Sequence, residues 1–114
     1  MTAPMTALPL TALRDFATGF VIRELGISAT DLCSHRKPQH LVAARALFVW
    51  IVRTHGPDFL SYPEIGRWLG GRDHTTIRHL YLNRVPVLRQ RDTTFSELCR
   101  RASERITKEQ ITWH

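Results

Sequence analysis

Apolar residues recur at helical spacing along most of the chain, and this pattern predicts an all-α fold. From Leu13 to Leu25 they lie on one helix face, and Gly26 supplies a stop. Residues 40–54 are apolar around most of their surface, so we expect them to form the central and most buried helix. No alternating strand pattern occurs in the sequence. The pattern therefore predicts a compact domain of about five to six helices.

Capping residues and glycines divide the second half of the chain into shorter helices. Ser61-Tyr-Pro-Glu64 matches a capping box and predicts a short helix that ends at Gly70-Gly71. A second helix is expected to follow at once, over His74–Asn83. Thr94-Phe-Ser-Glu97 matches another capping box and predicts the last helix. Two short helices joined by a tight glycine turn are typical of a helix-turn-helix.

The segments outside these helices have a different character. Residues 1–10 carry two prolines and no helical periodicity, so we expect a flexible arm, with residues 11–114 forming the helix-turn-helix domain. Between the first helix and the central one, Ser28 is expected to cap a short helical turn. Residues 34–40 follow as a polar, basic loop.

The charge of the chain favours a polyanionic partner. Sixteen Lys and Arg residues outnumber ten Asp and Glu residues, which gives a net charge of +6. Fourteen of the basic residues are Arg, whose guanidinium grips phosphates and guanine edges through paired donors. Residues 33–91 carry ten basic and three acidic side chains, so this stretch alone has a net charge of +7. Clustered basic charge is typical of nucleic-acid binding, although a solvated basic face without a partner is also common.

The start of the second short helix concentrates side chains suited to base recognition. In a helix-turn-helix, the second helix enters the major groove and its first residues meet the base edges. Here those residues are Arg72, Asp73, His74, Thr75 and Thr76. Arg binds guanine O6 and N7, Asp accepts from the cytosine amino group, and a Thr methyl packs on the thymine methyl. The alternative is that Asp73 only caps the helix and that the others are ordinary first-turn residues.

Residues Pro63–His79 closely resemble the signature of the DNA-binding domain (domain IV) of the DnaA family of bacterial chromosomal replication initiators. The core of this likeness is Gly70-Gly-Arg-Asp-His-Thr-Thr76, a seven-residue match. Val42–Arg53 resembles the long helix of that family, and the likeness extends over roughly residues 15–106. The resemblance implies a stand-alone domain that binds double-stranded DNA sequence-specifically at DnaA-type sites.

The resemblance also implies a contact role for individual side chains. For the major groove, the expected base contacts are Arg72, Asp73, His74, Thr75 and Arg53. For the phosphates, the expected contacts are Tyr62, Pro63, Thr76, Arg78 and Arg45. The basic loop is expected to reach the minor groove through Arg36 and Lys37. Lys37 stands where arginine is usual in the family, which weakens the expected contact because a narrow minor groove favours arginine.

Other departures from the family concern the scaffold and the ATP-binding region. Ala44 replaces the usual proline, and the connection over residues 55–60 is a couple of residues longer than the common one. Initiators of this family carry an ATP-binding region before the DNA-binding domain. This chain contains no Gly-x-x-x-x-Gly-Lys-Ser/Thr loop. We therefore expect a binding module that has no ATPase activity and binds neither a nucleotide nor another cofactor.

The residues do not support several other functional classes. Cys33 and Cys99 lack zinc-site spacing and are interpreted as buried free thiols. The six histidines show no His-x-x-x-His pair, so no metal site is predicted, and no catalytic constellation indicates an enzyme. The longest apolar run, Ala46–Val52, is too short to span a bilayer, and residues 1–13 lack the basic start of a signal peptide. We expect a cytoplasmic, nucleoid-associated protein without a membrane partner.

These observations favour one function and leave two alternatives open. The favoured function is sequence-specific DNA binding as a regulator of transcription or of replication initiation, with other replication or transcription proteins as further candidate partners. The first alternative is a protein-interaction module on the same scaffold. The second is a basic protein that binds the nucleoid without sequence preference.

Overall fold

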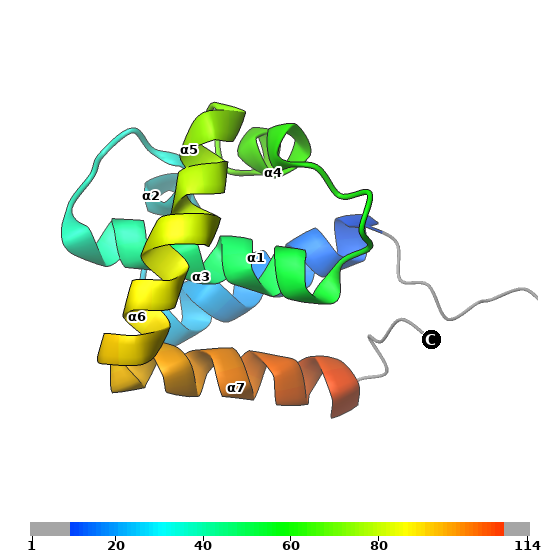
Figure 1. Cartoon of the computed structure of the whole chain (residues 1–114), viewed down its shortest axis with the longest axis vertical. Coiled ribbons are helices and arrows are strands. Elements are labelled where there is room, and N and C mark those ends of the chain that lie inside the picture. The colour runs from blue at the N-terminus through cyan, green and yellow to red at the C-terminus, as the bar shows by residue number, and fades with distance from the viewer. Residues whose placement is uncertain (1–9, 109–114) are drawn as a thin grey trace, which may run out of the picture.

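The computed structural model describes residues 10–108, and within them the chain folds into helices without a strand. The helices are α1 (Leu10–Leu25), α2 (Ala29–Cys33), α3 (Gln39–His55), α4 (Tyr62–Trp68), α5 (His74–His79), α6 (Val85–Arg91) and α7 (Thr93–Lys108). A π-helical turn, η1 (Leu80–Arg84), joins α5 to α6, so that the three form one continuous rod (Figure 1). With this rod counted once, residues 10–108 form six helical segments, which confirms the predicted all-α fold. The predicted arm lies outside the described residues except for Leu10, which opens α1.

Helix α3 is the centre of the fold, as its apolar surface predicts. Every residue from Ala44 to Val52 is buried. The helix packs against α1, α2, η1, α6 and α7, which surround it (Figure 1). Its buried side chains form one core with Phe20 of α1, Ile77 of α5 and Leu98 of α7. The remaining helices are therefore positioned by what they bury against α3.

Helices α4 and α5 form the predicted helix-turn-helix. Gly70 and Gly71 turn the chain between them in the left-handed conformation, with φ of +83° and +81°. Gly66, inside α4, allows the backbones on either side of the turn to approach closely. A Cβ at this position would overlap the carbonyl oxygen of Arg72. The turn thus depends on glycine for its backbone conformation and also for space.

The two predicted capping boxes have different outcomes. Ser61 caps α4, since its Oγ accepts a hydrogen bond from the N–H of Glu64 at 3.3 Å, while the Glu64 carboxylate forms an ion pair within α4. The predicted cap of the last helix is wrong. Thr94 lies inside α7, and Asp92 provides the cap, with Oδ1 accepting from the N–H of Phe95 at 3.1 Å. Asp92 directly precedes α7, where a carboxylate reaches the unpaired N–H groups of the first turn.

The second helix of the motif runs beyond its predicted end at Asn83, because α5 continues through η1 into α6. In the π turn, the N–H of Val85 donates to the carbonyl of Leu80, five residues earlier. Pro86 accounts for this wider turn. Proline has no N–H to donate to the carbonyl of Leu82, and its ring would collide with that carbonyl in a regular α-helix.

Candidate nucleic-acid interface

The first side chains of α5 and its cap are uncovered by the rest of the fold. Asp73, His74, Thr75 and Thr76 are all exposed. Asp73 caps the helix, since its Oδ1 accepts a hydrogen bond from the N–H of Thr75 at 3.2 Å. The same oxygen lies 3.0 Å from Nδ1 of His74. The cap fixes the start of the helix and leaves the side chains of Thr75 and Thr76 exposed.

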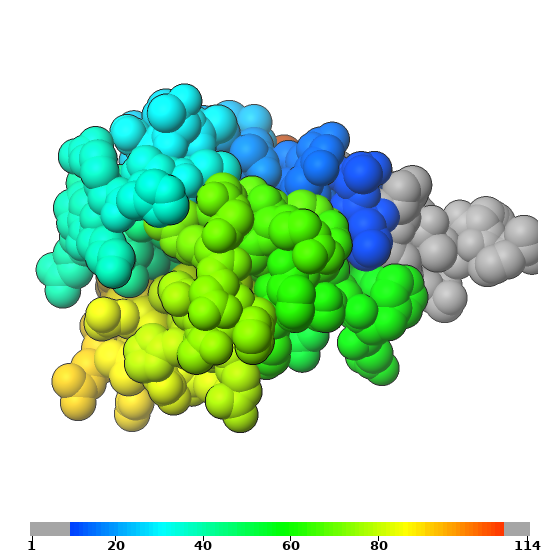
Figure 2. All heavy atoms as spheres, turned by 90° about the horizontal axis from the view of Figure 1, so that it is seen from above, coloured from blue at the N-terminus to red at the C-terminus, as the bar shows by residue number. Residues whose placement is uncertain are grey.

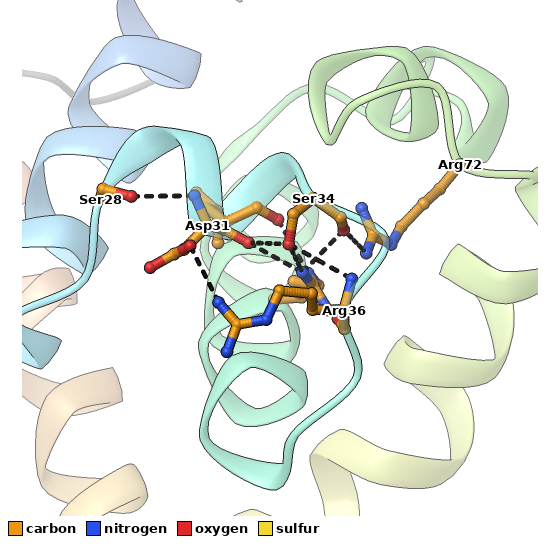
Figure 3. Close-up of polar contacts among 7 residues, drawn as sticks. Ser28, Asp31, Ser34, Arg36 and Arg72 are labelled. Carbon is orange, nitrogen blue, oxygen red and sulfur yellow. Dashed lines mark hydrogen bonds and ion pairs between the residues drawn. The ribbon is translucent and has the colours of Figure 1, made fainter.

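Arg72, the residue before this cap, is tied into the fold. Its side chain is half-buried, its Nη1 donates to the carbonyl of Leu69 at 2.7 Å, and its Nη2 donates to the carbonyl of Ser34 (Figure 3). Burial lowers the pKa of Arg72 from its ordinary value, against an opposing effect of Cys33. The guanidinium predicted to contact a base therefore donates two of its N–H groups to backbone carbonyls.

Arg45 lies inside the protein, a position that does not fit its predicted phosphate contact. Its side chain is 3% exposed, and burial lowers its pKa. Nε donates to the carbonyl of Leu32 at 2.8 Å and Nη1 to that of Arg36 at 2.7 Å. Nη2 donates to the carbonyls of Asp31 and Ser34, at 2.9 and 2.8 Å. The last carbonyls of a helix lack partners within it, and Arg45 supplies donors for α2 and for the loop that follows.

The loop at residues 34–38 presents the two predicted minor-groove residues. Arg36 and Lys37 are both exposed. Nη1 of Arg36 lies 3.4 Å from Oδ1 of Asp31 in an ion pair at the surface (Figure 3). Exposed ion pairs contribute little free energy, so this contact opens at small cost when a phosphate competes for the guanidinium.

Arg53, another predicted base contact, is half-buried between α3, the start of α4 and the rod. Its guanidinium carbon lies 4.7 Å from the ring centroid of Tyr62 and 5.5 Å from that of Tyr81. Nη1 donates to the carbonyl of Leu60 at 2.7 Å, and within residues 10–108 the buried Nε has no hydrogen-bond partner. These contacts hold Tyr62, and with it the first turn of α4, against the rod.

One face of the molecule brings the exposed candidate residues together. Of the remaining predicted phosphate contacts, Pro63, Thr76 and Arg78 are exposed, and Tyr62 is half-buried. Figure 2 looks onto this face and shows the cyan α2 and its loop beside the green α4 and α5. The loop that carries the exposed Arg36 and Lys37 therefore lies on the same face as α4 and α5, while Arg45 is buried.

Other candidate chemistry is not assembled in the described part of the chain. Residues 10–108 hold no group of three His, Cys, Asp or Glu side chains that would bind a metal ion. Cys99 is buried as predicted, and burial raises its pKa to about 11. Cys33 is only half-buried, and its Sγ donates to the carbonyl of Trp68 at 3.6 Å. No described helix combines the length and the apolar character that crossing a membrane requires.

The sequence reasoning missed the carbonyl of Ser34 as a shared acceptor for Arg45 and Arg72. One signal was available for Arg45, because an arginine flanked on both sides by apolar residues of the central helix predicts a buried partner. The partners are backbone carbonyls, however, and the residue types in a sequence do not show which carbonyls need a donor.

The fold and this face define a helix-turn-helix domain, which is a binding unit and not a catalytic one. Residues 18–82 match the family described as bacterial dnaA protein helix-turn-helix. The chromosomal replication initiator proteins DnaA of Nitrobacter hamburgensis and Rhodopseudomonas palustris are each 38% identical to this chain over 77 residues. That of a Bradyrhizobium species is 36% identical over the same length.

The chain belongs to the bacterial DnaA helix-turn-helix family. The aligned residues make up 68% of this chain but only 16% of each of these relatives. No solved structure matches the chain significantly. The non-catalytic nature of the matched region agrees with the prediction that the chain is not an enzyme.

Proposed function

We propose that this chain binds double-stranded DNA sequence-specifically, with α5 in the major groove and the loop at residues 34–38 over the minor groove. The observation that carries the proposal is the exposed run Asp73–Thr76 at the start of the second helix of a helix-turn-helix. This is the part of the motif that meets base edges in proteins of this class. The partial positive charge of a helix start and the basic excess of residues 33–91 both favour a polyanion.

We divide the predicted contacts into exposed side chains that are assigned to DNA and arginines that act from within the fold. His74 and Thr75 are the proposed base contacts, and Asp73 adds a carboxylate that caps α5 and can also accept from a cytosine amino group. Exposed groups assigned to the phosphates are Pro63, Thr76 and Arg78, and Arg36 and Lys37 are assigned to the minor groove. Arg45 and Arg53 act from within the fold, the first on the loop and the second on Tyr62 of α4.

The proposal is tested by selecting bound duplexes from a random pool and measuring affinity for the selected duplex and for a scrambled one. We expect the wild-type protein to prefer the selected duplex by about three orders of magnitude, as specific DNA-binding proteins do. Thr75→Ala is expected to lose about tenfold of that preference, the size of one good base contact. Thr94→Ala, which removes the same side chain from an exposed position on α7, is the matched control.

Two outcomes of this experiment contradict the proposal. Equal wild-type affinity for the selected and scrambled duplexes would favour a protein that coats DNA without sequence preference. No measurable binding to any duplex would favour a protein-interaction module on the same scaffold.

We further propose that the chain regulates replication initiation or transcription in the cytoplasm, at sites on the nucleoid. The relatives it matches are named chromosomal replication initiator proteins. Mapping the chromosomal sites occupied by the wild-type protein, with Thr75→Ala as the reference, distinguishes the two roles. Occupancy at the replication origin supports the first role, and occupancy at promoters supports the second. Occupancy spread evenly over the chromosome contradicts both.

A further inference from the structure

One backbone carbonyl, that of Ser34, connects the two elements that are assigned to DNA. Nη2 of Arg45 donates to it from α3 at 2.8 Å, and Nη2 of Arg72 donates to it from the turn of the helix-turn-helix. Ser34 is the C-cap of α2 and begins the loop that carries Arg36 and Lys37. Arg72 precedes α5 by two residues. Figure 3 shows its side chain reaching from the turn across to Ser34.

Neighbouring contacts bring the same two backbone segments together. Sγ of Cys33 donates to the carbonyl of Trp68 at 3.6 Å, and a Cβ on Gly70 would overlap the carbonyl oxygen of Cys33. The guanidinium of Arg72 spans the gap, with Nη1 on the carbonyl of Leu69 at 2.7 Å and Nη2 on that of Ser34. Most of these contacts end on backbone oxygens, so they fix the path of the loop without using the side chains of Arg36 and Lys37.

The chemistry of Arg72 suits this bridging position. A guanidinium is planar and rigid and presents donors in fixed directions, so that one side chain joins two carbonyls with little loss of entropy. Because a carbonyl does not neutralise the guanidinium, the junction retains positive charge beside the proposed DNA face. Two of the five guanidinium N–H groups of Arg72 are engaged with backbone carbonyls in the protein without DNA.

We propose that Arg72 is a positioning residue that sets the spacing between the loop at residues 34–38 and α5, so that they reach the minor and major grooves together. The inference rests on the proposed function, because it needs both elements to contact DNA. Arg72 then acts on affinity and specificity through the loop, in place of the base contact predicted from the sequence. Pre-organising the two elements lowers the entropy lost on binding.

The proposal is tested by a double-mutant cycle on the duplex that the wild-type protein selects. The loop variant carries Arg36→Ala and Lys37→Ala, and it is combined with Arg72→Ala. If Arg72 positions the loop, removing the loop side chains costs less affinity once Arg72 is absent. We expect the loss to shrink by about threefold or more, as for residues coupled in one network.

Arg78→Ala is the matched control for this cycle, since Arg78 is an exposed arginine of α5. Its loss of affinity is expected to multiply with that of the loop variant without coupling. If Arg72→Ala also shows independent losses, Arg72 does not act through the loop and the proposal is overturned. A loss of preference at a single base pair, with the contribution of the loop intact, would restore the predicted base contact.

A measurement without DNA separates this inference from the proposed function. Hydrogen exchange of the amides at residues 34–37 is expected to become faster in Arg72→Ala, while the amides of α3 stay protected and show that the fold is intact. Arg72→Lys keeps the positive charge but lacks the planar set of donors of a guanidinium, and it is expected to show the same faster exchange. If the exchange rates of these amides are unchanged in both variants, Arg72 does not position the loop, whether or not the wild-type protein binds DNA.

Discussion

The loop at residues 34–38 and the outer face of α7 both rely on arginines, but the arginines have opposite kinds of partner. Beside the loop, Arg45 and Arg72 donate to backbone carbonyls. On α7, Arg100 pairs with the carboxylates of Glu97 and Glu104. The hydrogen bond from Arg100 lowers the pKa of Glu97, and the same bond raises the pKa of Arg100.

This difference shows how one residue type stabilises two regions with different electrostatic results. A carbonyl accepts a hydrogen bond without cancelling the charge of the donor, whereas a carboxylate cancels it. The loop region is therefore held in place by arginines that remain sources of positive potential. The exposed cluster on α7 sets Arg100 against two carboxylates, and its contribution to stability is small. Residues 33–91, which include the proposed DNA face, carry a net charge of +7.

The largest expected effect follows from removing a carbonyl-bound arginine. Arg45→Met keeps much of the apolar volume but leaves the carbonyls of Leu32 and Arg36 without their donor. We expect the free energy of unfolding to fall by about 3 kcal/mol, since each unsatisfied buried acceptor costs about 1–3 kcal/mol. Urea unfolding followed by circular dichroism measures this change.

Arg100→Gln on α7 is the control for that experiment, because it removes an arginine whose partners are exposed carboxylates. Its urea midpoint is expected to match that of the wild-type protein within error. Equal destabilisation by Arg45→Met and Arg100→Gln would break the contrast between the two regions.

A smaller effect separates two neighbouring glycines of the turn beside the loop. Gly70 and Gly71 have nearly the same positive φ, but only at Gly70 would a Cβ overlap a neighbour, the carbonyl oxygen of Cys33. Gly71→Ala is expected to cost about 1–2 kcal/mol, the penalty for an alanine in the left-handed region. Gly70→Ala should cost more, because the end of α2 at Cys33 must also move. Equal thermal midpoints for the two variants would show that the end of α2 does not press on the turn.

The smallest effect concerns pH and falls on the α7 side. His55 is half-buried, its Nε2 lies 2.9 Å from Oγ of Ser103 in α7, and burial lowers its pKa. The unfolded chain binds a proton at the ordinary value of about 6.5, while the folded protein resists protonation. Stability therefore falls as the pH drops through the ordinary value of about 6.5, where the unfolded chain takes up the proton. The arginines beside the loop do not titrate in this range, so the acid sensitivity belongs to the contact between α3 and α7.

Thermal unfolding at several pH values tests this expectation. His55→Gln should reduce the decline in melting temperature toward low pH, and His40→Gln, at an exposed position, should keep it. A decline of the same size in His55→Gln as in the wild-type protein would assign the acid sensitivity to other groups.

The periodic part of the sequence predicted most of the fold. The apolar spacing of Leu13–Leu25 and of residues 40–54 located α1 and α3, and Ser61 with Gly70-Gly71 located the helix-turn-helix. The π turn was not predicted, because Pro86 acts through the carbonyl of the preceding turn and leaves the surrounding helical pattern intact.

At His74 and Thr75 the exposure of the side chains and their place at the start of α5 agree with the expectation from the motif, and their contact with DNA stays a prediction. The burial of Arg45 does not fit its predicted phosphate contact, and the sequence shows a basic residue but not its partners, the carbonyls of Leu32 and Asp31, which lie 13 and 14 residues earlier in the chain. Side chains that serve backbone groups therefore need a structure before their role is assigned.

The π turn has a consequence for the side of the rod that faces the core. The apolar side chains on that side are Ile77, Leu80, Tyr81, Val85 and Leu88, and the step from Leu80 to Val85 spans the π turn. In a regular α-helix, Arg84 would follow Leu80 into the core. The wider turn holds one additional residue and keeps Val85 in the frame that the core requires. The wider turn therefore lets Ile77 on one side of it and Val85 on the other pack into the same core.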